Sequence, residues 1–208
     1  GGVIFPNPNA PTSIYEDLEF VEDIIRHNQD VIVIVDEAYI DFAGESALSL
    51  LDKYDNLIIT QTFSKARSMA GMRIGYAIAS PLLIKYLNDA KYSFNSYTMN
   101  KTSLVYGVEA VKDKEYFAET TRKIVETRDW AEEEFKKLGF VFPKPSANFI
   151  FVSHPEYDAK ELFEAMKAKG IYVRFWGSER IEQYLRVTIG TREEMEALFA
   201  FLRKYMKK

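Results

Sequence analysis

The 208-residue chain contains no cysteine, only two histidines and no long apolar run. Without cysteine it can form neither a disulfide nor a thiolate metal site, which fits a reducing compartment. No run approaches the roughly 20 apolar residues that a membrane helix needs. The histidines, His27 and His154, are far apart in the sequence, so we expect no metal site. We therefore expect a cytoplasmic protein that makes no contact with a membrane.

The sequence also has fewer basic than acidic residues. The sequence has 27 Lys and Arg against 31 Asp and Glu, which gives a net charge of −4. Surfaces that bind nucleic acid are usually basic, so we expect no nucleic-acid partner. With 47% hydrophobic residues, a chain of this length can bury a substantial core in one large or two small domains.

Short apolar runs alternate with segments of helical periodicity. Residues 31–35 are apolar without a break, as in a strand that is buried in a parallel sheet. We predict the other strands at residues 3–5, 57–62, 75–79, 148–152, 171–175 and 185–189. The helices are predicted at residues 14–27, 46–54, 100–111 and 159–169, with one that begins at residue 81 and one at the end of the chain. This order predicts an α/β fold with right-handed crossovers.

A long helix is predicted in the middle of the chain. Four apolar side chains recur along it every seven residues: Phe117, Ile124, Ala131 and Leu138. A coiled coil has such a repeat, but three heptads of mixed polarity favour a helix that links two domains. We therefore predict one domain at residues 1–112, and the linking helix with a small second domain at residues 113–208.

A lysine with phosphate-binding neighbours follows the strand at residues 57–62. Lys65 lies just beyond the strand end, where an open α/β sheet binds its ligands. A desolvated lysine attacks aldehydes to form a Schiff base. Arg73 and the hydroxyls of Thr62 and Ser64 can bind a phosphate. These groups suit pyridoxal 5'-phosphate, an aldehyde that carries a phosphate. The alternative is a solvated surface lysine before an ordinary loop.

Two further regions give these residues a context. The motif Asp36-Glu37-Ala38-Tyr39 directly follows the strand at residues 31–35, and a proline-rich loop occupies residues 5–13. Together with the lysine stretch, they resemble the ordered signature of the fold-type I aminotransferases that use pyridoxal phosphate. Among these, the sequence is most similar to the histidinol-phosphate aminotransferases. The matching segments are residues 36–42, 61–65, 70–76 and 185–191.

The resemblance implies a fold and an assembly. The first part of the chain would be part of the large PLP-binding domain, with a mostly parallel sheet in which the strand at residues 75–79 is antiparallel. The second part would be the small α+β domain. Members of the family form homodimers. They are also longer, so we expect that a part upstream of Val3 is missing here and that the cofactor is held weakly.

The resemblance also implies roles for individual residues. Lys65 would form the Schiff base and move a proton at the substrate α-carbon. Asp36 would pair with the pyridine nitrogen and keep it protonated. Tyr39 would donate a hydrogen bond to the 3-oxygen of the ring. Thr62, Ser64 and Arg73 would bind the phosphate.

The substrates implied are glutamate or 2-oxoglutarate and histidinol phosphate or imidazole-acetol phosphate, in histidine biosynthesis. Arg174 and Arg186 would bind the anionic group of the substrate, and Asn95 is a further candidate contact. Two simpler interpretations stay open. Arg186 could be a solvated arginine at a strand edge, and Asn95 could serve only in the packing of its loop.

The sequence departs from the family pattern at two positions of the proline-rich loop. The family has asparagine where this chain has Ala10, and we expect Asn9 to take its place beside the ring 3-oxygen, with Asn7 as the alternative. The family has glycine where this chain has Ser13, although serine adopts a positive φ less readily. Two other functions are compatible with the sequence: a decarboxylase that acts on threonine phosphate, and a non-catalytic fragment that binds no cofactor.

Overall fold

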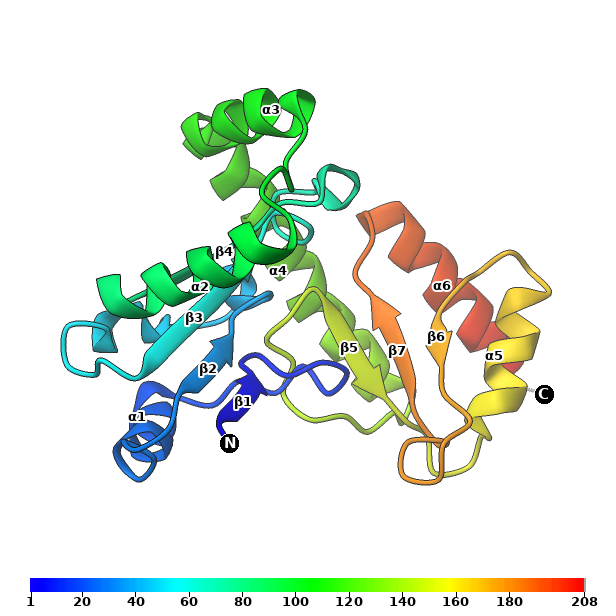
Figure 1. Ribbon diagram of the computed structural model, residues 1–208. Helices are drawn as coiled ribbons and strands as arrows, with labels where there is room; N and C mark the ends of the chain where they lie inside the picture. Colours follow the sequence, from blue (N-terminus) through cyan, green and yellow to red (C-terminus); the bar gives the residue numbers. More distant parts are fainter. Residues whose placement is uncertain (208) are drawn as a thin grey trace. The chain divides into compact units, whose positions relative to one another are not determined.

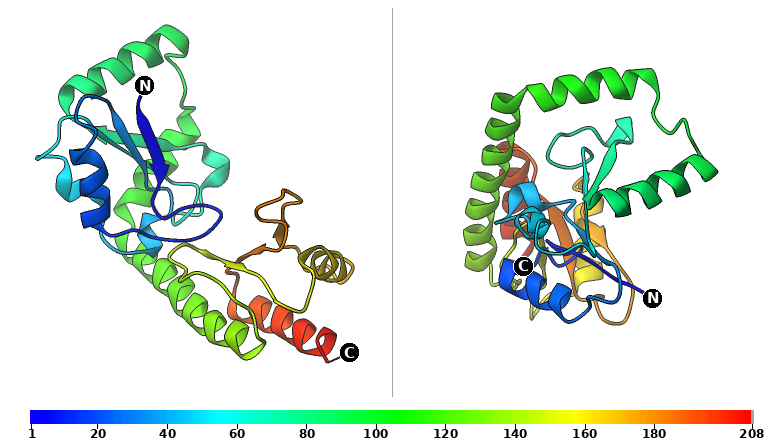
Figure 2. Two further views of the ribbon diagram at one scale, coloured as in Figure 1. Left: turned by 90° about the horizontal axis from the view of Figure 1, so that it is seen from below. Right: turned by 60° about the vertical axis from the view of Figure 1, so that its left-hand side comes forward.

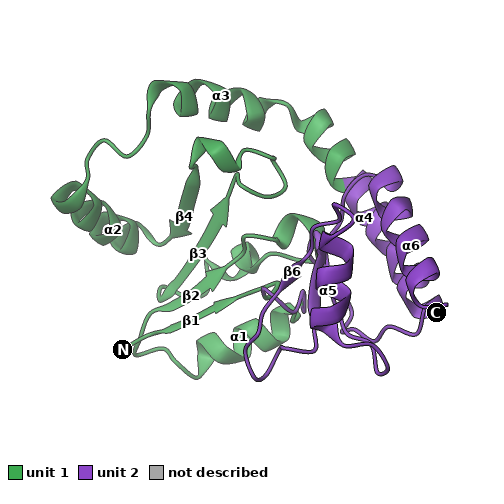
Figure 3. Cartoon of the chain, turned by 90° about the vertical axis from the view of Figure 1, so that its right-hand side faces the viewer, with its two compact units in different colours: residues 1–9, 15–121 green, residues 10–14, 122–208 purple. Residues whose placement is uncertain are grey.

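The computed structural model describes residues 1–207, which form two compact units (Figure 3). Unit 1 comprises residues 1–9 and 15–121, and unit 2 comprises residues 10–14 and the chain from residue 122 onward. The division falls within the long helix, whereas the sequence placed it at residue 112. The inclusion of residues 10–14 in unit 2 was not predicted. No helix in the described part of the chain is both long and apolar enough to cross a membrane.

Unit 1 is built on a four-stranded sheet in the order β1-β2-β3-β4 (Figure 1). The first three strands, β1 (Val3–Pro6), β2 (Val33–Asp36) and β3 (Leu57–Thr62), are parallel. The fourth, β4 (Gly75–Ala79), is antiparallel to β3. The bounds of β3 and β4 agree with those predicted, and the mostly parallel α/β sheet confirms the predicted fold class.

One face of this sheet is covered by α1 (Leu18–Arg26) and the 3-10 helix η2 (Ala47–Leu50) (Figure 2). The apolar side chains that meet there are fully buried: Val21, Ile25, Val33, Val35, Leu57 and Ile59. Of residues 31–35, this packing buries Val33 and Val35, whereas Ile32 is 42% exposed, so the strand is not buried on both faces as its unbroken apolar run predicted. Only η2 forms where a helix was predicted at residues 46–54.

Helix α1 begins four residues later than the sequence predicted. The side chain of Asn7 accepts a hydrogen bond from the Glu16 N–H at 2.9 Å and donates one to the Glu16 carbonyl at 2.8 Å. The backbone of Glu16 is therefore bound outside the helix. Asp17 then caps the helix by accepting a hydrogen bond from the Phe20 N–H.

Three helices complete the course of the chain through unit 1. Helix α2 (Pro81–Phe94) follows β4, α3 (Lys101–Lys112) comes next, and α4 (Lys114–Lys137) continues into unit 2. The predicted loop at residues 93–97 begins only after Phe94. Both α2 and α3 carry large apolar side chains on their exposed sides.

Unit 2 contains an antiparallel sheet in the order β5-β7-β6. Its strands are β5 (Phe149–Val152), β6 (Arg174–Phe175) and β7 (Leu185–Thr188), and β6 is shorter than the predicted strand at residues 171–175. One face of the sheet packs against α4, α5 (Ala159–Lys167) and α6 (Arg192–Tyr205).

Of the heptad stripe of α4, Phe117 lies in unit 1, whereas the other three residues belong to this core: Ile124, Ala131 and Leu138. Ala131 and Phe135 are buried, and the Phe135 ring lies 4.8 Å from that of Phe199 in α6. A capping box fixes the start of α6, because Thr191 and Glu194 exchange hydrogen bonds with each other's backbone. From Ile124 onward the stripe thus serves as a core surface of unit 2, in line with a single helix instead of a coiled coil.

Ser13 links residues 10–14, the first segment of unit 2, to the loop before β5. Its side chain is fully buried, and its backbone has φ 65°. The hydroxyl oxygen accepts hydrogen bonds from the Ser146 N–H at 3.0 Å and the Ala147 N–H at 2.8 Å. Serine therefore adopts the positive φ that the family's glycine would take, and its hydroxyl supplies an acceptor that glycine lacks.

We predict that Ser13→Ala lowers the free energy of unfolding by about 2 kcal/mol, because the buried Ala147 N–H loses its acceptor. Ser13→Gly should cost less, since glycine adopts the positive φ freely. Urea denaturation measures both. Ser49→Ala is the control, because the Ser49 hydroxyl is exposed. A Ser13→Ala variant as stable as Ser49→Ala would contradict this role.

Candidate active site

The carboxyl ends of β2 and β3 place the predicted catalytic side chains at one edge of the sheet of unit 1. The two strands are parallel neighbours, with Asp36 opposite Thr60. The Glu37 N–H continues the pairing by donating to the Thr60 carbonyl at 2.8 Å. Lys65 follows the end of β3 by three residues. Ligands of open α/β sheets bind at this type of edge.

Lys65 lies against the ring of Tyr39. Its Nζ is 5.1 Å from the ring centroid, a distance at which a cation is attracted to an aromatic face. Tyr39 is buried, whereas Lys65 is half-buried. Within residues 1–207, the Lys65 amine makes neither a hydrogen bond nor an ion pair. The structure thus brings two predicted site residues together and leaves the amine available.

Asp36 also has a carboxylate oxygen without a hydrogen bond among the described residues. One carboxylate oxygen, Oδ1, accepts a hydrogen bond from the Ala38 N–H at 3.1 Å. In the described part of the chain, the other oxygen has no hydrogen-bond partner. The residue is half-buried, so this oxygen can accept a hydrogen bond from a ligand that lies at the edge of the sheet.

The three predicted phosphate ligands differ in what they can offer. The Thr62 hydroxyl donates to the Ile74 carbonyl at 3.2 Å and accepts from the Ser64 N–H at 3.1 Å, so its hydrogen is already used. Among the described residues, the Ser64 hydroxyl has no partner. Arg73 is exposed, has φ 57° and donates from one Nη to the Ala70 carbonyl. Ser64 and Arg73 therefore retain free donors, and Thr62 serves the local turn.

A buried acid that the sequence did not single out supports this edge. Glu37 is only 2% exposed and accepts hydrogen bonds from the Ala47 N–H at 2.7 Å and from Gln61 Nε2 at 2.8 Å. Gln61 in turn accepts one from the Tyr76 hydroxyl at 2.6 Å. Partial burial raises the pKa of Tyr76, so its hydroxyl stays a donor at neutral pH. This network holds the segment 36–39 against β3 and β4.

Arg67 is a second residue that sequence analysis missed. Its guanidinium lies 5.2 Å from the Phe63 ring centroid and 4.2 Å from that of Phe117, and it donates to the Ala110 carbonyl at 2.7 Å. These contacts join the lysine loop to α3 and the start of α4. The partners are distant in sequence, so no local pattern could have indicated them.

The predicted asparagines have different surroundings. One N–H and one lone pair of the Asn7 side-chain amide bind the Glu16 backbone, and its role as the alternative ligand stays a prediction. Asn9 is half-buried at the end of the unit 1 segment, and its ligand role stays a prediction. Asn95 is exposed and its Oδ1 accepts from the Tyr97 N–H at 3.2 Å, which is a contact within its own loop.

In unit 2, the two predicted anion-binding arginines lie side by side. Arg174 on β6 and Arg186 on β7 are directly opposite in the antiparallel register. They stand on the face of the sheet that is turned away from the helix-covered core. Like charges directly opposite each other destabilise a sheet. Within residues 1–207, neither guanidinium forms a hydrogen bond or an ion pair.

Aromatic rings support both guanidinium groups. Arg186 lies 4.9 Å from the Phe149 ring centroid and 5.4 Å from that of Trp176, and Arg174 lies 5.2 Å from the Trp176 ring. The Nε of Arg186 is buried without a hydrogen-bond partner. A buried donor without a partner is costly unless a ligand satisfies it. The pair is therefore suited to bind a carboxylate or a phosphate.

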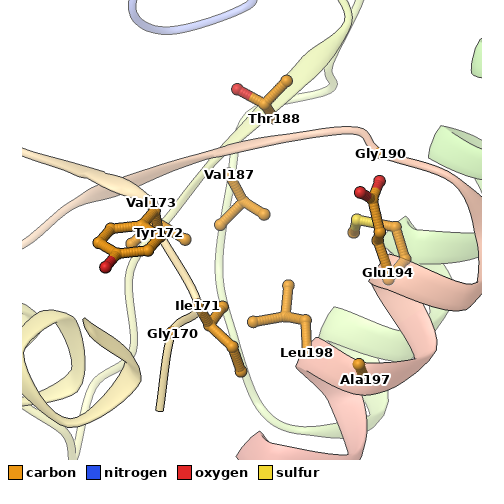
Figure 4. A pocket seen from close by; sticks show the side chains of 11 residues that line it. Gly170, Ile171, Tyr172, Val173, Val187, Thr188, Gly190, Glu194, Ala197 and Leu198 are labelled. Atoms are coloured by element: carbon orange, nitrogen blue, oxygen red, sulfur yellow. The ribbon is translucent and has the colours of Figure 1, made fainter. Parts of the chain in front are cut away.

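The other face of this sheet carries a cavity with different chemistry (Figure 4). It has a volume of about 400 Å³ and is lined mainly by apolar side chains such as Ile171, Val187 and Leu198. Its one acid, Glu194, already accepts a hydrogen bond from the Thr191 N–H at 2.8 Å. The residues that line it include no lysine, arginine or histidine, and we assign no reaction to it.

The sequence profile of the family described as aminotransferase class I and II matches residues 1–202. The chain belongs to this family. It is 46% identical over 208 residues to a histidinol-phosphate aminotransferase from Clostridium botulinum (strain Okra / Type B1), and 50% identical over 208 residues to one from Brachyspira hyodysenteriae. Both matches cover the whole of this chain. They cover 59% of the length of the Clostridium protein and 58% of the length of the Brachyspira protein. The chain thus spans less than two thirds of their length.

A solved structure of another protein has the same fold as this chain. The histidinol-phosphate aminotransferase from Sinorhizobium meliloti, in complex with pyridoxal-5'-phosphate, superposes with a TM-score of 0.87 at 25% identity. The match covers 99% of this chain and 57% of that one. The fold predicted from the resemblance is therefore confirmed for both parts of the chain.

We predict that Glu37→Gln lowers the free energy of unfolding by about 2 kcal/mol. The introduced amide NH₂ would face donors where the carboxylate now accepts, and buried donors would lose their partner. Urea denaturation measures the loss. Glu45→Gln is the matched control, because Glu45 is exposed. Equal stability of the two variants would show that the Glu37 network does not hold the edge of the sheet.

Proposed function

We propose that this chain takes part in pyridoxal phosphate-dependent transamination between glutamate and histidinol phosphate, or their oxo counterparts. The observation that carries the proposal is the Lys65 amine, which lies on the Tyr39 ring at the carboxyl edge of a parallel sheet without an acidic partner among the described residues. Relatives up to 50% identical are named histidinol-phosphate aminotransferases, which supports the choice of reaction.

The residues of unit 1 fit the chemical groups of pyridoxal 5'-phosphate. The free amine of Lys65 suits an aldehyde, and the free oxygen of Asp36 suits a protonated ring nitrogen. Ser64 and Arg73 keep donors for a phosphate, and the predicted contact from Thr62 would first require its bond to Ile74 to break. When bound, this cofactor supplies an electron sink for the bond at the substrate α-carbon.

The chain's own residues then have distinct tasks. The Lys65 amine holds and returns the proton at the substrate α-carbon, as a general base and acid. The Asp36 carboxylate raises the pKa of a neighbouring ring nitrogen and keeps it protonated. The Tyr39 hydroxyl donates a hydrogen bond to the ring oxygen. Arg174 and Arg186 bind the anionic group of the substrate.

We also propose that the protein acts as a homodimer in the cytoplasm. Eight large apolar side chains of α2 and α3 are more than half exposed: Leu82, Tyr86, Tyr92, Phe94, Leu104, Val105, Tyr106 and Val108. So many exposed apolar side chains on two helices are typical of an interface between subunits. Analytical ultracentrifugation of the chain, with Leu104→Glu and Val108→Glu as variants, tests this association.

We predict that titration with pyridoxal phosphate produces a visible absorbance change that depends on Lys65. Lys65→Ala should abolish the change and any transamination, because the variant lacks the amine that forms the Schiff base with the aldehyde. Lys85→Ala is the control, since Lys85 is exposed on α2 and pairs with Asp89. If the unaltered chain shows no absorbance change, the result would support the alternative that this chain is a non-catalytic fragment that binds no cofactor.

Product analysis separates the proposed reaction from decarboxylation of threonine phosphate. A transaminase converts glutamate to 2-oxoglutarate in step with its second substrate and releases no carbon dioxide. We expect 2-oxoglutarate from the assembled enzyme with imidazole-acetol phosphate. Release of carbon dioxide from threonine phosphate, without this product, would instead establish the decarboxylase.

A further inference from the structure

Trp176 contacts both arginines of the proposed anion site in unit 2. Its ring centroid lies 5.2 Å from the Arg174 guanidinium and 5.4 Å from that of Arg186. Tryptophan is the aromatic side chain that attracts cations most strongly. Because the two arginines are directly opposite in the register, one indole offsets part of the repulsion between two like charges.

The position of the indole is itself fixed by other aromatic rings. Trp176 lies edge to face against Phe151, with ring centroids 6.2 Å apart. Phe151 stacks on Tyr184 at 4.5 Å with an angle of 9° between the rings. Phe151 also faces Arg186 across the strand pair. The floor beneath the guanidinium groups is therefore a packed aromatic surface.

The charges above this floor are not compensated by the protein. Among residues 1–207, no carboxylate forms an ion pair with either arginine, and one donor of Arg186, its buried Nε, has no partner. A ligand with one negative charge can neutralise only one of the two guanidinium groups. A dianion can neutralise both and accept hydrogen bonds from each.

We propose that Trp176 is a positioning residue that holds Arg174 and Arg186 as one clamp for a dianionic phosphate monoester, and that it disfavours a simple carboxylate at this place. This assignment rests on the proposed function, because it adds a positioning residue to the substrate site proposed there. Trp176 contacts no reacting atom in this account. It acts through the orientation and spacing of the two guanidinium groups.

The test measures anion binding and requires neither cofactor nor turnover. Methyl phosphate and acetate are titrated by calorimetry at about pH 8, where a phosphate monoester with a second pKa of about 6 is a dianion. We expect Trp176→Leu to weaken methyl phosphate binding by about tenfold or more, from the loss of two cation–π contacts. Acetate binding should change little, so the preference for the dianion falls.

Two further variants separate positioning from folding. Trp176→Phe keeps an aromatic face and should restore part of the affinity, whereas a purely space-filling role would make Leu and Phe equivalent. Trp130→Phe is the matched control, because Trp130 is the other tryptophan of the chain and contacts Arg192 on its face and Phe199 edge to face, away from the arginine pair. This control should bind methyl phosphate like the unaltered chain.

The Trp130→Phe chain also provides a direct spectroscopic reading. Its tryptophan fluorescence comes from Trp176 alone, so methyl phosphate should change the tryptophan emission with the same affinity that calorimetry gives. An unchanged emission, or a Trp176→Leu variant that binds methyl phosphate as tightly as before, would overturn the proposal. Lys65→Ala should still bind methyl phosphate, so failure of the clamp and failure of the transaminase assignment give different results.

Discussion

The parallel pairing of β2 with β3 is the constraint on which the site of unit 1 depends. It brings the ends of both strands to one edge, with Asp36 on one strand and Lys65 just beyond the other. The contact between Lys65 and the Tyr39 ring shows that the two loops meet there. The buried Glu37, held by Gln61 and an amide of η2, fixes the loop after β2 in place.

Both units expose cations that the described protein leaves without acidic partners. Lys65 rests on one aromatic ring in unit 1, and Arg174 and Arg186 share another in unit 2. A folded protein normally pairs such groups with acids or leaves them fully in water. Aromatic faces hold these three in place without an acidic partner, so the two arginines stay available for an anionic substrate and the Lys65 amine for an aldehyde.

The sequence predicted the elements whose cause is local, and missed the contacts that join distant segments. The bounds of β3 and β4 were predicted correctly, although only the first three residues of β3 and none of β4 are fully buried. The start of α1 was predicted too early, since the side chain of Asn7 binds the backbone of Glu16. The hydroxyl of Ser13 meets amides more than 130 residues away, and no local pattern indicates such a partner.

The most direct test of the account is chemical trapping of the amine that bonds to the cofactor. The chain is incubated with pyridoxal phosphate, reduced with borohydride, digested and analysed by mass spectrometry. The account predicts a phosphopyridoxyl group on the peptide that contains Lys65, and little on the surface lysines. Labelling spread evenly over the lysines, or concentrated on another one, would contradict the assignment of Lys65 as the cofactor-binding residue.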